Sequence, residues 1–143
     1  VGETEFHHPT DNIRTGVRYL RQLEEYFPNA RGRDRLLLML AAYNMGPGHL
    51  SDARQLAAEH GLDPNRWFGG VREVLPALGN PAVYRNLQHG FARGSDTLAY
   101  VESVWDQFLA YQRATAAGIF PGPDPRSSSS DLAAQPTDAM RQG

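Results

Sequence analysis

An uninterrupted apolar run at residues 36–42, which ends at a polar turn containing Gly46 and Pro47, constrains the fold more than any other feature of this sequence. A helix that is apolar on all sides has no face suited to water, so the run is predicted to lie inside a helical domain. Pro47 prevents the helix from continuing unbroken, and Gly46 allows a tight turn. The sequence therefore predicts that Tyr43 and Asn44 are the first polar groups at the end of a rigid scaffold.

Apolar residues spaced three and four positions apart predict an all-α fold. The first such stripe lies in residues 13–27, within a helix that starts at Thr10 or Asp11. No segment alternates as a half-buried β-strand does. The predicted long helices span residues 10–27, 34–43, 47–60 and 95–117.

Four polar or glycine positions indicate where helices begin and end. Gly61 stands where a left-handed C-terminal cap belongs, and Gly118 follows the last predicted helix. Asp63 and Asn80 each precede a proline, which is the pattern of a polar N-cap with proline at the first helical position. This pattern predicts a short helix after each of them.

The composition changes after residue 117. Prolines surround a run of serines at residues 127–130. Such a segment buries too little apolar area to offset its chain entropy, so residues 118–143 are predicted to be a disordered tail. With 41% hydrophobic residues in the chain, residues 1–117 are predicted to form one helical domain with a modest core.

The composition also excludes several classes of function. The formal net charge is -2 and every basic side chain is Arg, so no basic field is available for nucleic acid, which is not a predicted partner. The absence of cysteine excludes disulfides and thiolate metal sites. His7 and His8 lack further ligands at a suitable spacing, so no metal site is predicted. No window approaches the roughly 18 apolar residues of a membrane span.

Three segments resemble motifs of the family 1 lytic transglycosylases. Ala42-Tyr43-Asn44-x-Gly46 resembles the third motif of that family, residues 12–20 resemble the helix between its second and third motifs, and residues 95–101 resemble its fourth, tyrosine motif. The three segments occur in the order of the family. The resemblance covers roughly residues 9–111, and residues 61–67 are most similar to the membrane-bound F branch.

The resemblance implies an all-α, lysozyme-like domain with a cleft for the glycan strand of bacterial peptidoglycan. The family cleaves the β-1,4 bond between N-acetylmuramic acid and N-acetylglucosamine without water, and one glutamate serves as acid and then as base. By resemblance, Tyr100 orients that glutamate or the reacting sugar, while Tyr43, Asn44 and Gly46 bind the strand. No metal or organic cofactor is implied, and the implied location is the periplasm or cell envelope.

The glutamate itself is not found in this sequence. Neither the Glu-Ser motif nor the Gly-Leu-Met-Gln motif occurs before the first predicted helix, where the family has them, and the one Glu-Ser pair of the 143 residues, Glu102-Ser103, lies in the last predicted helix. One hypothesis is that the chain is the C-terminal part of a catalytic domain, inactive alone, whose partners are a missing N-terminal segment or other cell-wall proteins. The alternative is a non-catalytic peptidoglycan-binding or interaction module; a helical adaptor is a third, weaker hypothesis. A missing segment would leave one apolar face of residues 34–43 open to water, which predicts instability or self-association.

Other candidate residues have plainer interpretations. Glu102 and Asp106 stand one helical turn apart, yet they fall on the polar half of the last predicted helix and are interpreted as solvated rather than as paired catalytic acids. Tyr111 is interpreted as a packing residue. Two alternatives stay open: Trp67 lines a glycan groove or anchors a loop, and Tyr43 stacks on a sugar or covers the core.

Overall fold

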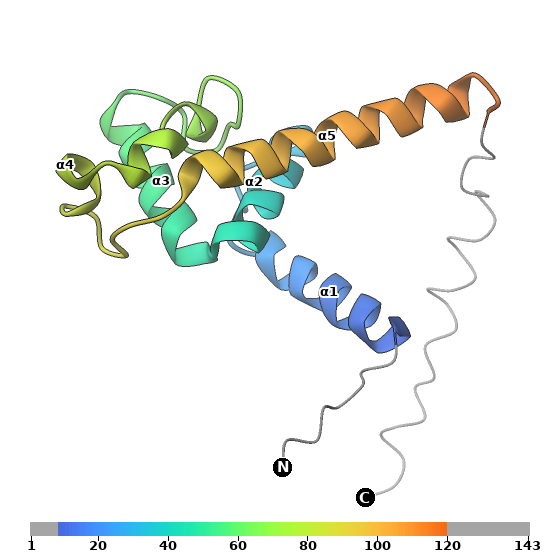
Figure 1. The fold of residues 1–143 in the computed structure, drawn as a ribbon, viewed down its shortest axis with the longest axis horizontal. Helices are drawn as coiled ribbons and strands as arrows, with labels where there is room; N and C mark the ends of the chain where they lie inside the picture. The colour runs from blue at the N-terminus through green and yellow to red at the C-terminus, as the bar shows by residue number, and fades with distance from the viewer. Residues whose placement is uncertain (1–8, 120–143) are drawn as a thin grey trace, which may run out of the picture. The chain divides into compact units, whose positions relative to one another are not determined.

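The structure is a computed structural model that describes the backbone of residues 9–119 and the side chains of residues 14–119. Over these residues the all-α prediction is confirmed, since their β-structure is limited to one isolated bridge between Asp63 and Gly70. His7, His8 and most of the predicted tail lie outside the described residues. Figure 1 shows the elements, which are α1 (Pro9–Glu24), α2 (Gly32–Met45), α3 (Pro47–Glu59), η1 (Val71–Glu73), η2 (Leu75–Gly79), α4 (Pro81–Tyr84) and α5 (Gly94–Ala116).

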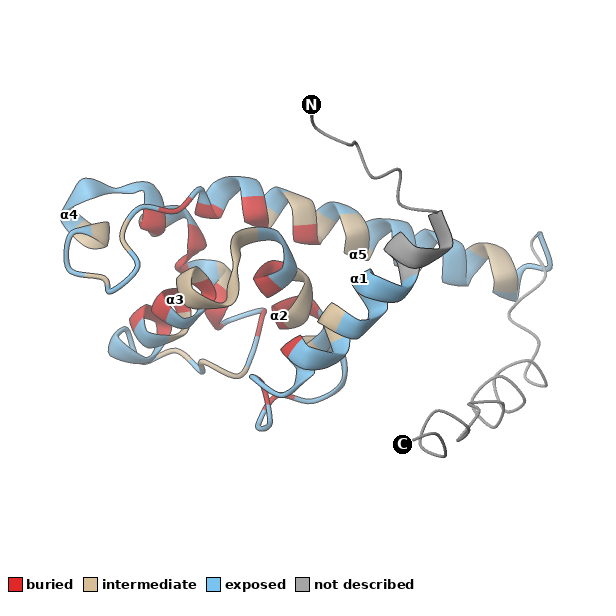
Figure 2. Ribbon diagram, turned by 90° about the horizontal axis from the view of Figure 1, so that it is seen from below, coloured by how far each residue is buried: buried red, intermediate tan, exposed pale blue. Residues whose placement is uncertain are grey.

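Helix α2 packs against both α1 and α3. Leu37 and Leu38 on α2 are fully buried, as the apolar run predicts. Figure 2 shows both buried and less buried stretches on this helix. The prediction that this helix is enclosed on all sides is wrong, because Leu36 is 40% exposed. Helices α1 and α3 and the core residue Trp67 cover part of the circumference of α2, and Leu36 is left partly exposed. Whether this exposed side lowers stability or promotes association stays a prediction.

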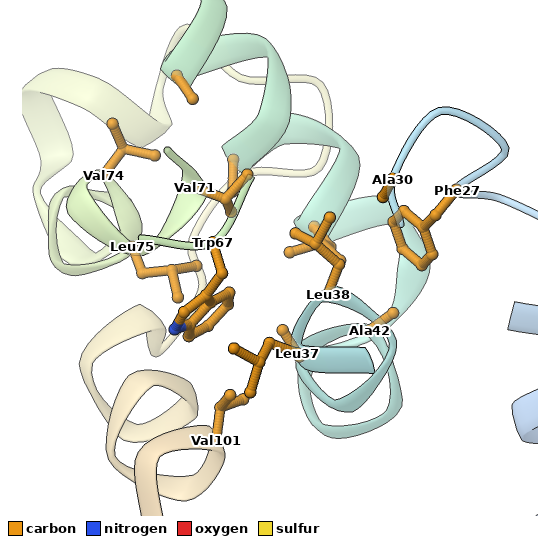
Figure 3. Close-up of a cluster of buried hydrophobic side chains, with 14 of the residues drawn as sticks. Phe27, Ala30, Leu37, Leu38, Ala42, Trp67, Val71, Val74, Leu75 and Val101 are labelled. Atoms are coloured by element: carbon orange, nitrogen blue, oxygen red, sulfur yellow. The ribbon is translucent and has the colours of Figure 1, made fainter. Parts of the chain in front are cut away.

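The core is completed by Trp67, which lies in the connection after α3 and has no exposed surface. Figure 3 shows its ring beside Leu37, Leu75 and Val101. Its backbone N–H also donates to Oδ1 of Asp34 at 2.9 Å, which ties the connection to the first turn of α2. Of the two alternatives for Trp67, the structure therefore supports the loop anchor.

The two predicted caps differ in outcome. Asn80 Oδ1 accepts from the Ala82 N–H at 3.0 Å and starts α4, so this cap is confirmed. The helix predicted after Asp63 is wrong. Asp63 Oδ1 instead accepts from the Asn65 N–H at 2.8 Å, which forms a local turn that brings Trp67 into the core.

Helix ends follow the glycines. Gly61 has φ +73 just after α3, as a left-handed C-terminal cap requires. The chain divides into two compact units, Val1–Trp105 and Asp106–Gly143, with the boundary inside α5. In the second unit the described residues contain the last turns of α5, which end before Gly118 at φ +74. The predicted domain boundary at residue 117 stays a prediction.

None of the helices within residues 9–119 is long and apolar enough to cross a lipid bilayer.

Candidate functional site

A single residue, Gly46, joins α2 to α3. Its φ of 93° and ψ of 147° lie in a region that side chains with a Cβ rarely adopt. Its N–H donates to the Ala42 carbonyl at 2.9 Å, and its own carbonyl accepts from Leu50 N–H at 3.2 Å. Both helices are thus tied to the same glycine, which fixes the end of α2 relative to the start of α3.

Asn44, in the last turn of α2, is held by a residue far along the chain. The hydroxyl of Thr97, in the first turns of α5, donates to Oδ1 of Asn44 at 2.8 Å across 53 positions of sequence. Thr97 is only 2% exposed, whereas Asn44 is exposed. Because Oδ1 is engaged, Asn44 offers its amide N–H2 group, a pair of donors, to a ligand.

This hydrogen bond lies at one wall of an open pocket of about 440 Å³, a volume within the usual range for small-molecule sites. The pocket is formed by the end of α2, the start of α3, the segment that precedes α5 and the first turn of α5. Its lining residues are Asn44, Met45, His49, Phe91, Ala92, Arg93, Asp96 and Thr97.

The other residues singled out from the sequence do not line this pocket. Tyr43 is 47% exposed, and its ring meets that of Tyr19 with the centroids 5.8 Å apart. It therefore presents an open aromatic face while resting on α1. Tyr100 is half-buried and packs against the core. The structure thus brings Asn44 to the pocket and leaves the substrate-binding and orienting roles of Tyr43, Gly46 and Tyr100 as predictions.

A buried carboxylate secures the segment that forms one pocket wall. Asp52, on α3, is 3% exposed and accepts from the backbone N–H of His89 at 2.8 Å and from its Nδ1 at 3.2 Å. The His89 ring lies so close to α3 that a Cβ on Gly48 would come within 2.6 Å of it. Asp52 thus holds the chain ahead of Phe91 and Arg93 in place.

The sequence does not reveal which residues line the pocket or hold its wall in place, because contacts between distant segments bring these residues together. One signal was available. Asp52 lies between positions predicted to be buried, Leu50 and Ala53, and a carboxylate on the buried side of a helix needs a partner. That signal predicts that a hydrogen-bond donor of the same chain meets Asp52, but it does not identify His89 as the donor.

The structure supports the interpretation of Glu102 as a surface residue rather than as one of two paired catalytic acids. Its Oε1 accepts from Nε of Arg72 at 2.6 Å, and this hydrogen bond raises the pKa of the Arg72 guanidinium above its ordinary value. The side chain of Glu102 is 39% exposed. Glu102 therefore belongs to a surface ion pair that links α5 to η1. Within residues 14–119, no three His, Asp or Glu side chains are grouped so as to hold a metal ion.

The Thr97 to Asn44 hydrogen bond makes a prediction of its own. Thr97→Val keeps the side-chain shape and removes the hydroxyl, so we expect the free energy of unfolding to fall by about 1 kcal/mol. The Asn44 side-chain amide signals in ¹⁵N NMR spectra should shift, because their oxygen loses its donor. Thr97→Ser, which keeps the hydroxyl, should restore both values; the hydrogen bond is refuted if the Val and Ser variants give the same Asn44 spectrum.

Comparisons with known proteins agree with the helical architecture. The family described as Transglycosylase SLT domain matches residues 2–64, which include the end of α2. The chain is 45% identical over 94 residues to the membrane-bound lytic murein transglycosylase F of Desulfosudis oleivorans, covering 65% of this chain and 20% of that protein. It is 44% identical over 97 residues to the membrane-bound lytic murein transglycosylase F 2 of Alkalilimnicola ehrlichii, covering 67% of this chain and 21% of that protein. The chain thus spans about a fifth of the length of these relatives.

Proposed function

We propose that this chain, which belongs to the transglycosylase SLT domain family, forms the glycan-binding part of a peptidoglycan lytic transglycosylase. The observation that supports this best is the hydrogen bond from Thr97 to Asn44. It joins two segments that are far apart in sequence and that resemble two motifs of the same family. A pocket opens where they meet, with lining residues from both.

In the proposed reaction a carboxylic acid protonates the bridging oxygen as the bond from it to C1 of N-acetylmuramic acid breaks. The resulting carboxylate then accepts the proton of the C6 hydroxyl, whose oxygen closes onto C1 and leaves a 1,6-anhydro ring. No water is consumed. We propose that the acid is supplied from outside these 143 residues, because their one Glu-Ser pair, Glu102-Ser103, lies on α5, where Glu102 forms an ion pair with Arg72.

We assign the roles of the chain from the geometry of its side chains. The amide N–H2 of Asn44 is free of the Thr97 contact and donates to the acetamido oxygen of a sugar. The exposed ring of Tyr43 stacks on a sugar face. Gly46 lets the strand approach the backbone closely. The half-buried Tyr100 orients the acid or the reacting sugar from α5.

The test is mass spectrometry of purified peptidoglycan after incubation with the longest form of the protein that the gene encodes, and in parallel with the 143-residue chain. We expect anhydromuropeptides from the longer form only. Asn44→Ala in that form should lower the initial rate about 2- to 10-fold, since it removes a neutral hydrogen bond worth about 0.5–1.5 kcal/mol.

The matched control is Asn29→Ala, which changes the same side chain at an exposed position away from the pocket and should leave the rate unchanged. Products from the 143-residue chain alone would refute the proposal that the acid lies outside it. No products from either form would refute the enzyme and favour the alternative, a non-catalytic peptidoglycan-binding module.

We also propose that the protein works at the cell envelope, in the periplasm or at the outer membrane. The support is that the relatives are named membrane-bound lytic murein transglycosylases. Fractionation of the source cells should place the protein with the envelope; recovery in the cytosolic fraction alone would refute this location.

A further inference from the structure

Three arginines form a stripe along the outward face of α1. Arg14, Arg18 and Arg21 are spaced four and three positions apart, so they fall within about 60° of one another around the helix axis. All three are exposed, whereas Leu23, on the opposite side of α1, is buried in the core. The described part of α1 is accordingly exposed along most of its length (Figure 2). These three residues, named the arginine stripe, face away from the core.

No carboxylate of the described residues neutralises the arginine stripe. Within residues 14–119, none of its members forms an ion pair. Glu24, the last residue of α1, is bound instead to Arg35 of α2, with Oε1 and Nη1 3.0 Å apart. Glu25, four positions after Arg21, is exposed and forms no ion pair with it. The stripe thus presents three positive charges to its surroundings.

Folding does not account for this concentration of charge. Like charges three or four positions apart on a helix repel and lower its stability, and the stripe contains two such pairs. Residues 14–35 contain six of the 14 basic residues and three of the 16 acidic residues, a net charge of +3 in a chain whose formal net charge is -2. A charge pattern that weakens the helix carrying it indicates a role in binding.

The span of the stripe favours a row of anionic groups over a single ion. Arg21 lies seven positions after Arg14, which is about 10 Å along the helix axis. One small anion cannot bind all three guanidinium groups over that length. Each guanidinium can bind a phosphate through two parallel N–H groups. The stripe therefore fits an array of phosphate groups, as found on a lipid bilayer or a nucleic acid.

An apolar side chain within the stripe favours the lipid surface. Val17 lies three positions after Arg14 and four before Arg21, and it is 46% exposed. At a bilayer such a side chain is buried at the boundary between headgroups and acyl chains. A nucleic-acid backbone offers it only phosphate and sugar. Guanidinium groups around an exposed valine therefore match an anionic bilayer better than a nucleic acid.

We propose that the arginine stripe binds the phosphate headgroups of an anionic phospholipid bilayer, with α1 lying along the surface. The inference goes beyond the proposed function and does not rest on it, because the stripe supplies no lining residue of the pocket. Each arginine close to an anionic surface adds about 5-fold to the affinity, and salt screens the attraction. The contact is therefore reversible and peripheral.

The experiment is sedimentation of the 143-residue chain with vesicles of phosphatidylglycerol and phosphatidylcholine in equal parts, and with vesicles of phosphatidylcholine alone. We expect the partition coefficient to be on the order of 100-fold larger for the anionic vesicles at low ionic strength, and to fall as salt is added. Arg18→Gln should lower the anionic value about 5-fold, and glutamine at all three stripe positions should lower it to the neutral value. Glutamine favours a helix about as well as arginine does, and circular dichroism verifies that helicity is retained.

The matched control places glutamine at three exposed arginines outside α1, which are Arg66, Arg85 and Arg113. It changes the net charge by the same amount and should keep the anionic preference within about twofold. Equal partition onto the two kinds of vesicle, or the same loss in the control as in the stripe variant, would overturn the inference. Binding of double-stranded DNA that requires the stripe, without binding of anionic vesicles, would also overturn it and would identify a nucleic-acid surface. A salt-sensitive preference for anionic vesicles that is lost in the stripe variant alone would support it.

Discussion

Replacing Gly94 by alanine is expected to lower the free energy of unfolding by more than about 4 kcal/mol, or to prevent folding. A Cβ at this position would overlap the carbonyl oxygen of Leu75 in η2, which is backbone and has no rotamer to change. Relief of the overlap requires the start of α5 to move away from η2. The same turn of α5 carries Thr97, so the hydrogen bond to Asn44 and the pocket wall would be lost with it.

Gly16 supplies the matched control. It lies inside α1, and a Cβ there would meet no atom within 4 Å. Gly16→Ala is expected to stabilise the chain by about 0.5–1 kcal/mol, because alanine loses less backbone freedom than glycine in a helix. Urea unfolding followed by circular dichroism compares the two variants. A Gly94→Ala midpoint equal to that of wild type would show that α5 does not approach η2 as closely as described.

Trp67→Ala is expected to lower the free energy of unfolding by about 3–5 kcal/mol. The ring is fully buried, and it contacts the core where α2, η2 and α5 meet (Figure 3). Truncation would leave a cavity that none of these elements can close without moving. Since the backbone of Trp67 also binds Asp34, the start of α2 should lose protection from hydrogen exchange in the variant.

The neighbouring Phe68 is the control for Trp67. Phe68 is 39% exposed, and the guanidinium groups of Arg33 and Arg72 lie 4.9 Å and 6.0 Å from its ring centroid. Phe68→Ala should therefore lower the free energy of unfolding by only about 0.5–1 kcal/mol. Chemical denaturation measures both values. If Phe68→Ala proves the more destabilising of the two, the assignment of Trp67 as the core anchor is wrong.

The two proline-preceded caps show what local sequence can predict. Asn80 and Asp63 carry the same signal, yet only Asn80 starts a helix. Trp67 is buried in the core only four residues after Asp63, so the chain has to turn inward at once. A turn at Asp63 allows this path, and a helix starting there would not. Tertiary packing therefore overrides the cap at one position, and the sequence around Asp63 contains no local sign of it.

The apolar run of α2 shows the same limit. Its periodicity predicts a helix and identifies Leu37 and Leu38 as buried, which the structure confirms. It does not identify the neighbours, which include α1, α3 and the ring of Trp67, and it does not predict that Leu36 is partly exposed. Local pattern predicts which residues prefer burial, whereas the arrangement of distant elements decides which of them are covered.

The candidate site is likewise only partly predictable from the sequence. The sequence marks Asn44 through the turn that follows it and through the resemblance of its motif. It does not mark Thr97, because the partner of Asn44 lies 53 positions away. The sequence does not single out Arg93 and Asp96 either, because two charged residues near the start of a helix are common. Only the structure shows that both side chains line the pocket.

The most direct test of the account is the position of glycan on this chain. We would record ¹⁵N chemical shifts of the 143-residue chain during titration with a peptide-free oligosaccharide of alternating N-acetylglucosamine and N-acetylmuramic acid. The account predicts that the largest changes occur at the side-chain amide of Asn44 and at the backbone amides of residues 43–49 and 91–97. Changes confined to other surfaces, or no change at saturating oligosaccharide, would contradict the claim that the end of α2 and the start of α5 form the glycan-binding site.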